Sequence, residues 1–165
     1  MKRIVLIALV LLLPVAVFAD IDFGVGGVAL YNSPLLVGGK ISTPDWNVNK
    51  FSFGPDLRLK WSILQLEALA LGSIGDYSSF DSYLDAGLAF DLLFLRLSAG
   101  GGLSLNYNFG DKSLDKGFNA KLNADLKLGK LSLGLTYIMD FTVADKKVNI
   151  DASQGLLGAS VLFWF

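Results

Sequence analysis

From Ile21 to Phe165 the chain alternates apolar and polar side chains with a period of two residues. Successive side chains of a β-strand point to opposite faces, so this period is typical of strands with one apolar and one polar face. The pattern is clearest over 118–128, where Phe, Ala and Leu at even numbers alternate with Asn, Lys and Asp at odd numbers. No stretch after residue 19 stays apolar long enough to form a membrane-spanning helix. The alternation therefore predicts an all-β domain.

Eight segments carry this alternation, and we expect each of them to form a strand. They are 21–31, 51–61, 64–70, 84–90, 95–107, 118–128, 131–141 and 154–165. The connections alternate between short links (61–64, 90–95 and 128–131) and long ones (32–49, 73–81, 108–116 and 142–151). A two-residue turn joins residues i and i+3, so the apolar face must change between odd and even numbers across it. It does so across 62–63 and 129–130, which predicts an up-and-down meander with tight turns at one end and loops at the other.

The first nineteen residues have the features of a targeting signal. Lys2 and Arg3 give a positive start, 4–18 is an apolar run, and Ala19 stands just before Asp20. These features predict a cleaved secretory signal peptide over 1–19 and a domain over 20–165. The alternative is an uncleaved membrane anchor, but the run is short and Pro14 interrupts it. We therefore expect the protein to leave the cytoplasm.

The composition argues against most chemistry. The chain has no Cys and no His, so it lacks thiolate sites and the usual member of metal sites and acid–base relays. A net charge of −1 is far from the basic excess that nucleic-acid binding needs. The glycine clusters at 24–27 and 100–102 lack the strand–loop–helix context of a phosphate-binding loop, and barrel curvature explains them better. We expect no cofactor, no metal, no nucleic-acid partner and no enzymatic activity.

The alternation alone fits either a soluble, lipocalin-like barrel or a membrane barrel. Two features favour the membrane. The polar face is rich in Gly and Ser and nearly balanced in charge, which suits the crowded inside of an eight-stranded barrel. Aromatic residues of the apolar face gather near the strand ends around an aliphatic middle, as in the girdles of transmembrane barrels. The predicted girdle residues are Phe23, Trp61 and Phe90 toward the short turns, and Tyr31, Phe51, Tyr107, Phe118 and Phe141 toward the loops. We therefore predict an eight-stranded antiparallel up-and-down transmembrane β-barrel in contact with membrane lipid.

The last strand ends on an aromatic residue and has apolar residues at every second position before it, namely Val161, Phe163 and Phe165. This pattern resembles the assembly signal of bacterial outer-membrane barrels. The chain from residue 20 onward is similar to the small outer-membrane β-barrel superfamily that includes OmpX, OmpW and the membrane domain of OmpA. The resemblance rests on architecture, signal peptide and last strand, and on no functional motif. It implies a place in the bacterial outer membrane and recognition by the barrel assembly machinery.

Charged residues of the polar face are predicted to meet inside the barrel. Pairing Trp61 with Leu64 sets Arg58 opposite Glu67 on the inward face. One interpretation is a structural salt bridge that helps to fill the lumen, and the other is a charged constriction in a pore. We favour the first, because an eight-stranded barrel is only wide enough to be filled by side chains. The predicted lumen charge network comprises Asp56, Arg58, Lys60, Glu67, Asp85, Arg96, Lys121 and Asp125.

Three functional hypotheses remain at this stage. The leading one is a structural or surface-interaction protein whose four long loops face outside. Within the first loop, 32–49, Pro34, Pro44 and Trp46 mark the favoured contact element for a surface ligand. The second is a narrow pore or a transporter of small molecules, hydrophobic ones included, although a charged lumen argues against an apolar path. The third is a soluble lipocalin-like binder.

Overall fold

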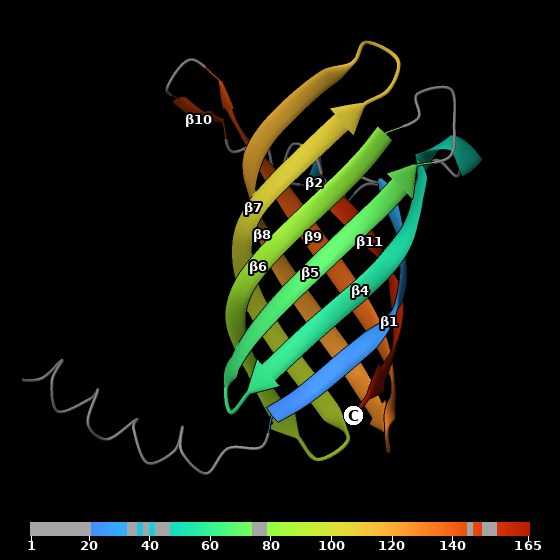
Figure 1. Ribbon diagram of the computed structural model, residues 1–165, viewed down its shortest axis with the longest axis vertical. Helices are drawn as coiled ribbons and strands as arrows, with labels where there is room; N and C mark the ends of the chain where they lie inside the picture. Colours follow the sequence, from blue (N-terminus) through green and yellow to red (C-terminus); the bar gives the residue numbers. More distant parts are fainter. Residues whose placement is uncertain are drawn as a thin grey trace, which may run out of the picture.

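Eight long antiparallel strands form a closed barrel in the computed structural model (Figure 1). The structure describes residues 21–32, 36–37, 40–41, 47–73, 79–144, 147–149 and 155–165. The predicted signal peptide over 1–19, and Pro34, Pro44 and Trp46 of the first loop, lie outside the described residues. Within the described part of the chain, no helix is long and apolar enough to cross a membrane. The predicted all-β fold class is confirmed.

The strands follow one another around the barrel in chain order. They are β1 (Ile21–Asn32), β4 (Phe51–Trp61), β5 (Leu64–Ser73), β6 (Ser79–Leu92), β7 (Leu95–Asn108), β8 (Ser113–Leu128), β9 (Leu131–Ala144) and β11 (Gly155–Trp164). Each pairs with its neighbours in this series, and β11 also pairs with β1, which closes the cylinder. Closure gives every wall strand a partner on both sides, so no open edge exposes unpaired backbone groups.

Short elements stand between or beside the barrel strands. In the connection after β1, the strands β2 (Leu36–Val37) and β3 (Lys40–Ile41) pair with each other, and the 3-10 helix η1 (Val48–Lys50) leads into β4. A further short strand, β10 (Lys147–Asn149), folds back onto the end of β9. All of these elements lie at the end of the barrel opposite the tight turns (Figure 1).

Three two-residue turns close the other end of the barrel. They are Ser62-Ile63, Leu93-Phe94 and Gly129-Lys130, and the first residue of each has a positive φ, at 58°, 48° and 69° respectively. Glycine adopts this left-handed conformation without strain, which explains its presence at position 129. The change of the apolar face between odd and even numbers is thus accounted for at all three links.

The third predicted loop, 108–116, is much shorter than expected. β7 runs to Asn108 and β8 begins at Ser113, so four residues make the whole connection. The Asn108 Oδ1 atom accepts a hydrogen bond from the Gly110 amide at 2.8 Å, and the Asp111 Oδ1 atom accepts one from the Ser113 amide at 3.1 Å. These side chains close a tight turn, and the hydrogen bonds from Ser113 lower the pKa of Asp111 below its ordinary value. Residues whose composition indicates a loop therefore form a tight turn between two long strands. The expectation of four long loops is wrong at this connection.

The two faces of the wall have opposite character. Leu97, Leu122 and Leu133 point outward and are 39%, 50% and 44% exposed, whereas Arg58 and Asp125 point inward and are 0% exposed. A soluble barrel would bury its leucines and expose its charges. This orientation excludes the lipocalin-like alternative.

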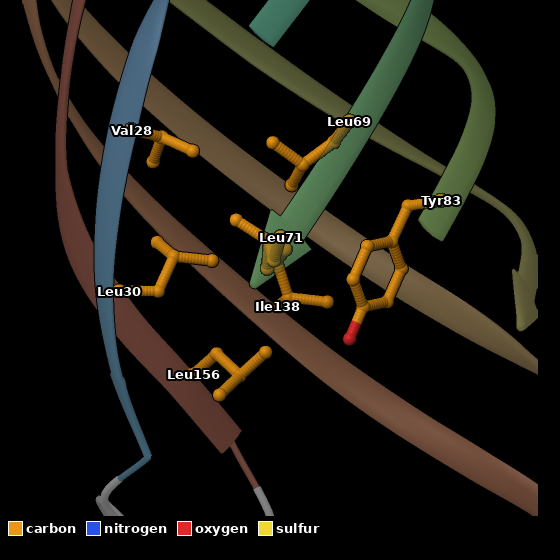
Figure 2. Close-up of a cluster of buried hydrophobic side chains, with 7 residues drawn as sticks. All are labelled: Val28, Leu30, Leu69, Leu71, Tyr83, Ile138 and Leu156. Atoms are coloured by element: carbon orange, nitrogen blue, oxygen red, sulfur yellow. The ribbon is translucent and has the colours of Figure 1, made fainter. Parts of the chain in front are cut away.

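The alternation suggests a polar lumen, but only part of the lumen is polar. Toward the loop end, inward-facing apolar side chains from five strands pack against one another (Figure 2). This apolar cluster consists of Val28, Leu30, Leu69, Leu71, Tyr83, Ile138 and Leu156. At these heights both faces of the strands are apolar, so a period of two gives no signal of which side chains point inward.

The wall between β4 and β5 has a local irregularity. The paired register runs through Phe53↔Gly72 and resumes at Asp56↔Leu69, with Gly54 and Pro55 between them. Proline has no amide to donate to a ladder. At Gly54 the two backbones approach so closely that a Cβ atom would overlap the Ala70 carbonyl oxygen. Only glycine fits at this point of the wall.

We expect Gly54→Ala to lower the free energy of unfolding by roughly 1–3 kcal/mol, because the added methyl group forces the two strands apart. Urea unfolding of the detergent-refolded protein, followed by tryptophan fluorescence, measures the change. Gly72→Ala on the partner strand is the matched control, since the nearest atom to its added Cβ, the Phe53 carbonyl oxygen, is 4.0 Å away. Equal unfolding midpoints for the two variants would contradict this account of Gly54.

Candidate functional site

Arg58 stands at the centre of the polar interior. Its Nη2 atom lies 2.7 Å from Asp56 Oδ2, its Nε atom 3.1 Å from Glu67 Oε1, and its Nη1 atom 2.9 Å from Asp125 Oδ2. Asp56 precedes Arg58 by two residues on the same face of β4. Glu67 on β5 is the register partner of Arg58. Asp125 comes from β8, across the lumen. The planar guanidinium group, with five N–H donors in a rigid fork, suits this many-sided binding of carboxylates.

Lys121 extends the central cluster toward β6. Its Nζ atom lies 2.7 Å from Glu67 Oε1 and 3.7 Å from Asp85 Oδ2. Glu67 is therefore shared between Lys121 and Arg58. The side-chain amides of Asn123 and Asn119 donate hydrogen bonds to Glu67 and Asp85, at 3.1 and 2.8 Å. The buried charges are thus paired and hydrogen-bonded, as burial in a protein interior requires.

A second layer of charges lies near the short turns. The Arg96 Nε atom is 2.6 Å from Asp91 Oδ1, and its Nη2 atom is 2.9 Å from Asp22 Oδ2. The Arg96 guanidinium group stacks 4.0 Å from the Trp164 ring, an attractive cation–π arrangement. Lys60 joins the layer through Asp91, at 3.0 Å. Asp22, Asp91 and Trp164 were not in the predicted network, although their inward position follows from the same alternation.

Polar groups also occupy the lumen at the loop end. The Tyr83 hydroxyl donates a hydrogen bond to Asp140 Oδ2 at 3.0 Å, and the Asn106 amide donates one to Asp81. The Tyr83 ring belongs to the apolar cluster, so this residue links the cluster to the polar mouth. The interior therefore has three levels: the Arg96 layer, the central cluster around Arg58, and the apolar cluster with its polar rim.

The central cluster leaves little free space. A cavity of about 10 Å³ lies beside it, with Gln65, Ser98 and Lys121 among its lining residues. This volume holds roughly one water molecule. Glycine makes the close packing possible: at Gly134 a Cβ atom would overlap the Asp125 carboxylate. At this level the lumen is filled by side chains.

The predicted network residues thus divide into two groups. Asp56, Arg58, Glu67, Asp85, Lys121 and Asp125 gather in the central cluster, and Lys60 and Arg96 belong to the layer near the turns. Among the residues that the structure describes, no group of three or more acidic side chains is arranged to hold a metal ion. The arrangement is suited to bracing and filling the barrel.

Comparison with known proteins supports this reading of the fold. The computed structure is similar to the crystal structure of Neisserial surface protein A, with a TM-score of 0.53 and 18% sequence identity. The match covers 89% of this chain and 99% of that one. The chain has the fold of the small eight-stranded outer-membrane barrels. No protein-family model matches the sequence, and no curated protein matches it either. The likeness therefore lies in the fold.

Of the predicted girdle residues, Phe23, Trp61, Phe90 and Phe118 are exposed on the barrel wall. At the loop end, the Tyr31 and Phe51 rings meet edge to face with centroids 4.8 Å apart, and Tyr31 is only 6% exposed. At the turn end, Phe163 contacts Phe165 with centroids 5.0 Å apart. Phe163 pairs with Val25 and Val161 with Gly27, so the apolar residues of the last strand line the seam where the barrel closes.

We expect Arg58→Gln to lower the free energy of unfolding by roughly 3–5 kcal/mol, because it leaves three buried carboxylates without their shared cation. Chemical unfolding of the refolded barrel measures the loss. Lys130→Gln removes the same charge from an exposed turn and should change stability by less than about 0.5 kcal/mol. A barrel that tolerates both substitutions equally would show that the central cluster does not stabilise the fold.

Proposed function

We propose that this protein is a bacterial outer-membrane barrel whose role is structural or surface-interacting, and that its lumen does not conduct. The observation that carries the proposal is the central cluster, in which fully buried Arg58 joins β4 to Asp125 on β8 across the lumen. An eight-stranded barrel has room for side chains or one small ligand, and here side chains occupy that room.

The alternative of a narrow pore or a transporter loses support from the same geometry. A hydrophilic solute would have to pass the apolar cluster around Leu30 and Leu71. A hydrophobic solute would have to pass the ion pairs of Arg58. Each layer opposes the class of molecule that the other would admit, so a path through the barrel requires both to rearrange.

The outward leucines and the likeness in fold support the proposed placement in the membrane. Transmembrane barrels have short periplasmic turns and longer extracellular loops, so the end that carries β2, β3 and β10 faces the cell exterior in this proposal. The first loop, 32–49, remains the proposed contact element for a surface ligand. The outer faces of Val161 and Phe163 fit recognition by the barrel assembly machinery, and the outer wall fits membrane lipid. We propose no catalytic role, because the interior acids serve as ion-pair and hydrogen-bond partners.

Conductance tests the closed lumen. In planar bilayers the refolded, purified barrel should show no sustained discrete openings, because both interior layers must rearrange before ions pass. A general porin measured in the same bilayers verifies that openings are detectable. Sustained openings of the purified barrel would favour the pore.

Insertion of an epitope tests the orientation. A tag placed between Gly110 and Asp111 should be labelled by antibody on intact cells, because this turn lies at the proposed exterior end. The same tag between Gly129 and Lys130 should be labelled only after the outer membrane is permeabilised. The reverse pattern of labelling would overturn the proposed orientation.

A further inference from the structure

The outer wall of the barrel carries a groove of roughly 500 Å³ that runs across β4 to β8. Small side chains line part of it, namely Ala68, Ala70 and Ser82, and larger ones such as Leu57 and Leu103 line the rest. Small residues between larger ones leave a hollow in an otherwise convex surface. The lining of the groove is almost entirely apolar, and the groove extends across several strands. Both properties suit a hydrocarbon chain.

Two polar side chains in this groove are exceptional. Along the outward-facing positions of the barrel strands, as far as the structure describes them, Lys116 is the only charged residue and Ser82 the only aliphatic hydroxyl. Both line the groove. Ser82 pairs with Leu105, and Leu105 pairs with Lys116, so the two flank one leucine in a single row across three strands. Within the described wall, the one outward-facing charge and the one outward-facing aliphatic hydroxyl therefore lie in the same groove.

In the proposed membrane orientation, neighbouring aromatic residues place this row near the edge of the hydrocarbon. The next outward-facing row toward the loop end consists of Phe80, Tyr107 and Leu114, and it continues the aromatic girdle that marks a membrane interface. A lysine on the lipid face is costly unless its ammonium group reaches the interface. Within the described residues Lys116 forms no ion pair, so its charge is available to an anion at that height.

We propose that this groove binds an anionic, phosphate-bearing lipid of the surrounding bilayer, with an acyl chain along the apolar lining and the phosphate at Lys116 and Ser82. The inference rests on the proposed membrane function. The charge at one end of the groove complements a lipid phosphate, and the apolar lining complements the chain attached to it. The occupant that we propose is a lipid, because a free phosphate ion would leave the apolar lining empty.

A second groove on the wall provides an internal control. It measures roughly 440 Å³ across β6 to β9 and β11, and Ala99, Leu122 and Ala124 are among its lining residues. No charged residue lines it. It should therefore accept acyl chains without selecting their headgroup, whereas the groove with Lys116 should select an anionic one.

Quenching by brominated lipids tests the proposal. The barrel is refolded into phosphatidylcholine vesicles that contain either brominated phosphatidylglycerol or brominated phosphatidylcholine. Trp61→Phe removes an outward-facing tryptophan, and Phe118→Trp then places a probe beside the first groove, while Tyr137→Trp places one in the second. The protein without either added tryptophan gives the background.

At the Phe118→Trp probe we expect a preference of about fivefold for phosphatidylglycerol, the effect of one lysine near a charged headgroup. Lys116→Gln should reduce this preference to about one, whereas Lys130→Gln at the other end of the barrel should leave it unchanged. At the Tyr137→Trp probe no preference is expected. Ala68→Phe, which fills the first groove but keeps Lys116, should also reduce the preference.

Several results would overturn the inference. A preference that survives Lys116→Gln, or an equal preference at the two probes, would show that lipids are not selected at this groove. Quenching by both lipids without preference would overturn the lipid site alone. If neither lipid quenches either probe, the barrel wall does not face hydrocarbon, and the proposed membrane function fails with the inference.

Discussion

Closure of the backbone ladder is the constraint on which the rest of this structure depends. In a hydrocarbon environment each unpaired amide or carbonyl group costs several kcal/mol, so a sheet must end where it began. Here β8 pairs with β9, and β11 pairs with β1, which leaves no free edge in the wall. Once the cylinder is closed, every second side chain must enter a lumen of fixed width. The chemistry of that lumen follows from this geometry.

The lumen resolves a conflict between polarity and space. The outward face is taken up by leucines and aromatic residues, so the polar half of each strand is forced inward. Charges confined in this way must pair, and the cluster of Arg58, Glu67 and Asp125 does so with contacts of 2.9 to 3.1 Å. Lys121 and Asn123 contact the two carboxylate oxygens of Glu67. The result is a braced interior, in which cross-lumen ion pairs connect strands that share no hydrogen-bonded ladder.

Much of the fold could be predicted because the alternation is strong wherever one face is apolar and the other polar. The alternation over 118–128 predicts one strand in this way. The hairpin register that sets Arg58 opposite Glu67 follows from the single turn between β4 and β5. Other features could not be predicted for physical reasons. The approach of Arg58 to Asp125 depends on how the closed barrel staggers its strands, and a local register does not contain that information. The inward Leu69 stands between Ala68 and Ala70, and the inward Leu71 stands between Ala70 and Gly72, so the period of two gives no signal there. Asn108 and Asp111 indicate a loop by composition, but they cap a tight turn.

The interruption at Gly54 and Pro55 has a mechanical consequence. The ladder between β6 and β7 continues without a gap from Ser79↔Asn108 to Leu92↔Leu95, whereas the one between β4 and β5 skips two positions. A cylinder with one weaker seam does not deform evenly, because elastic strain concentrates where the fewest bonds resist it. The β4–β5 seam is thus the natural hinge line of the wall, and thermal breathing of the barrel should be greatest along it.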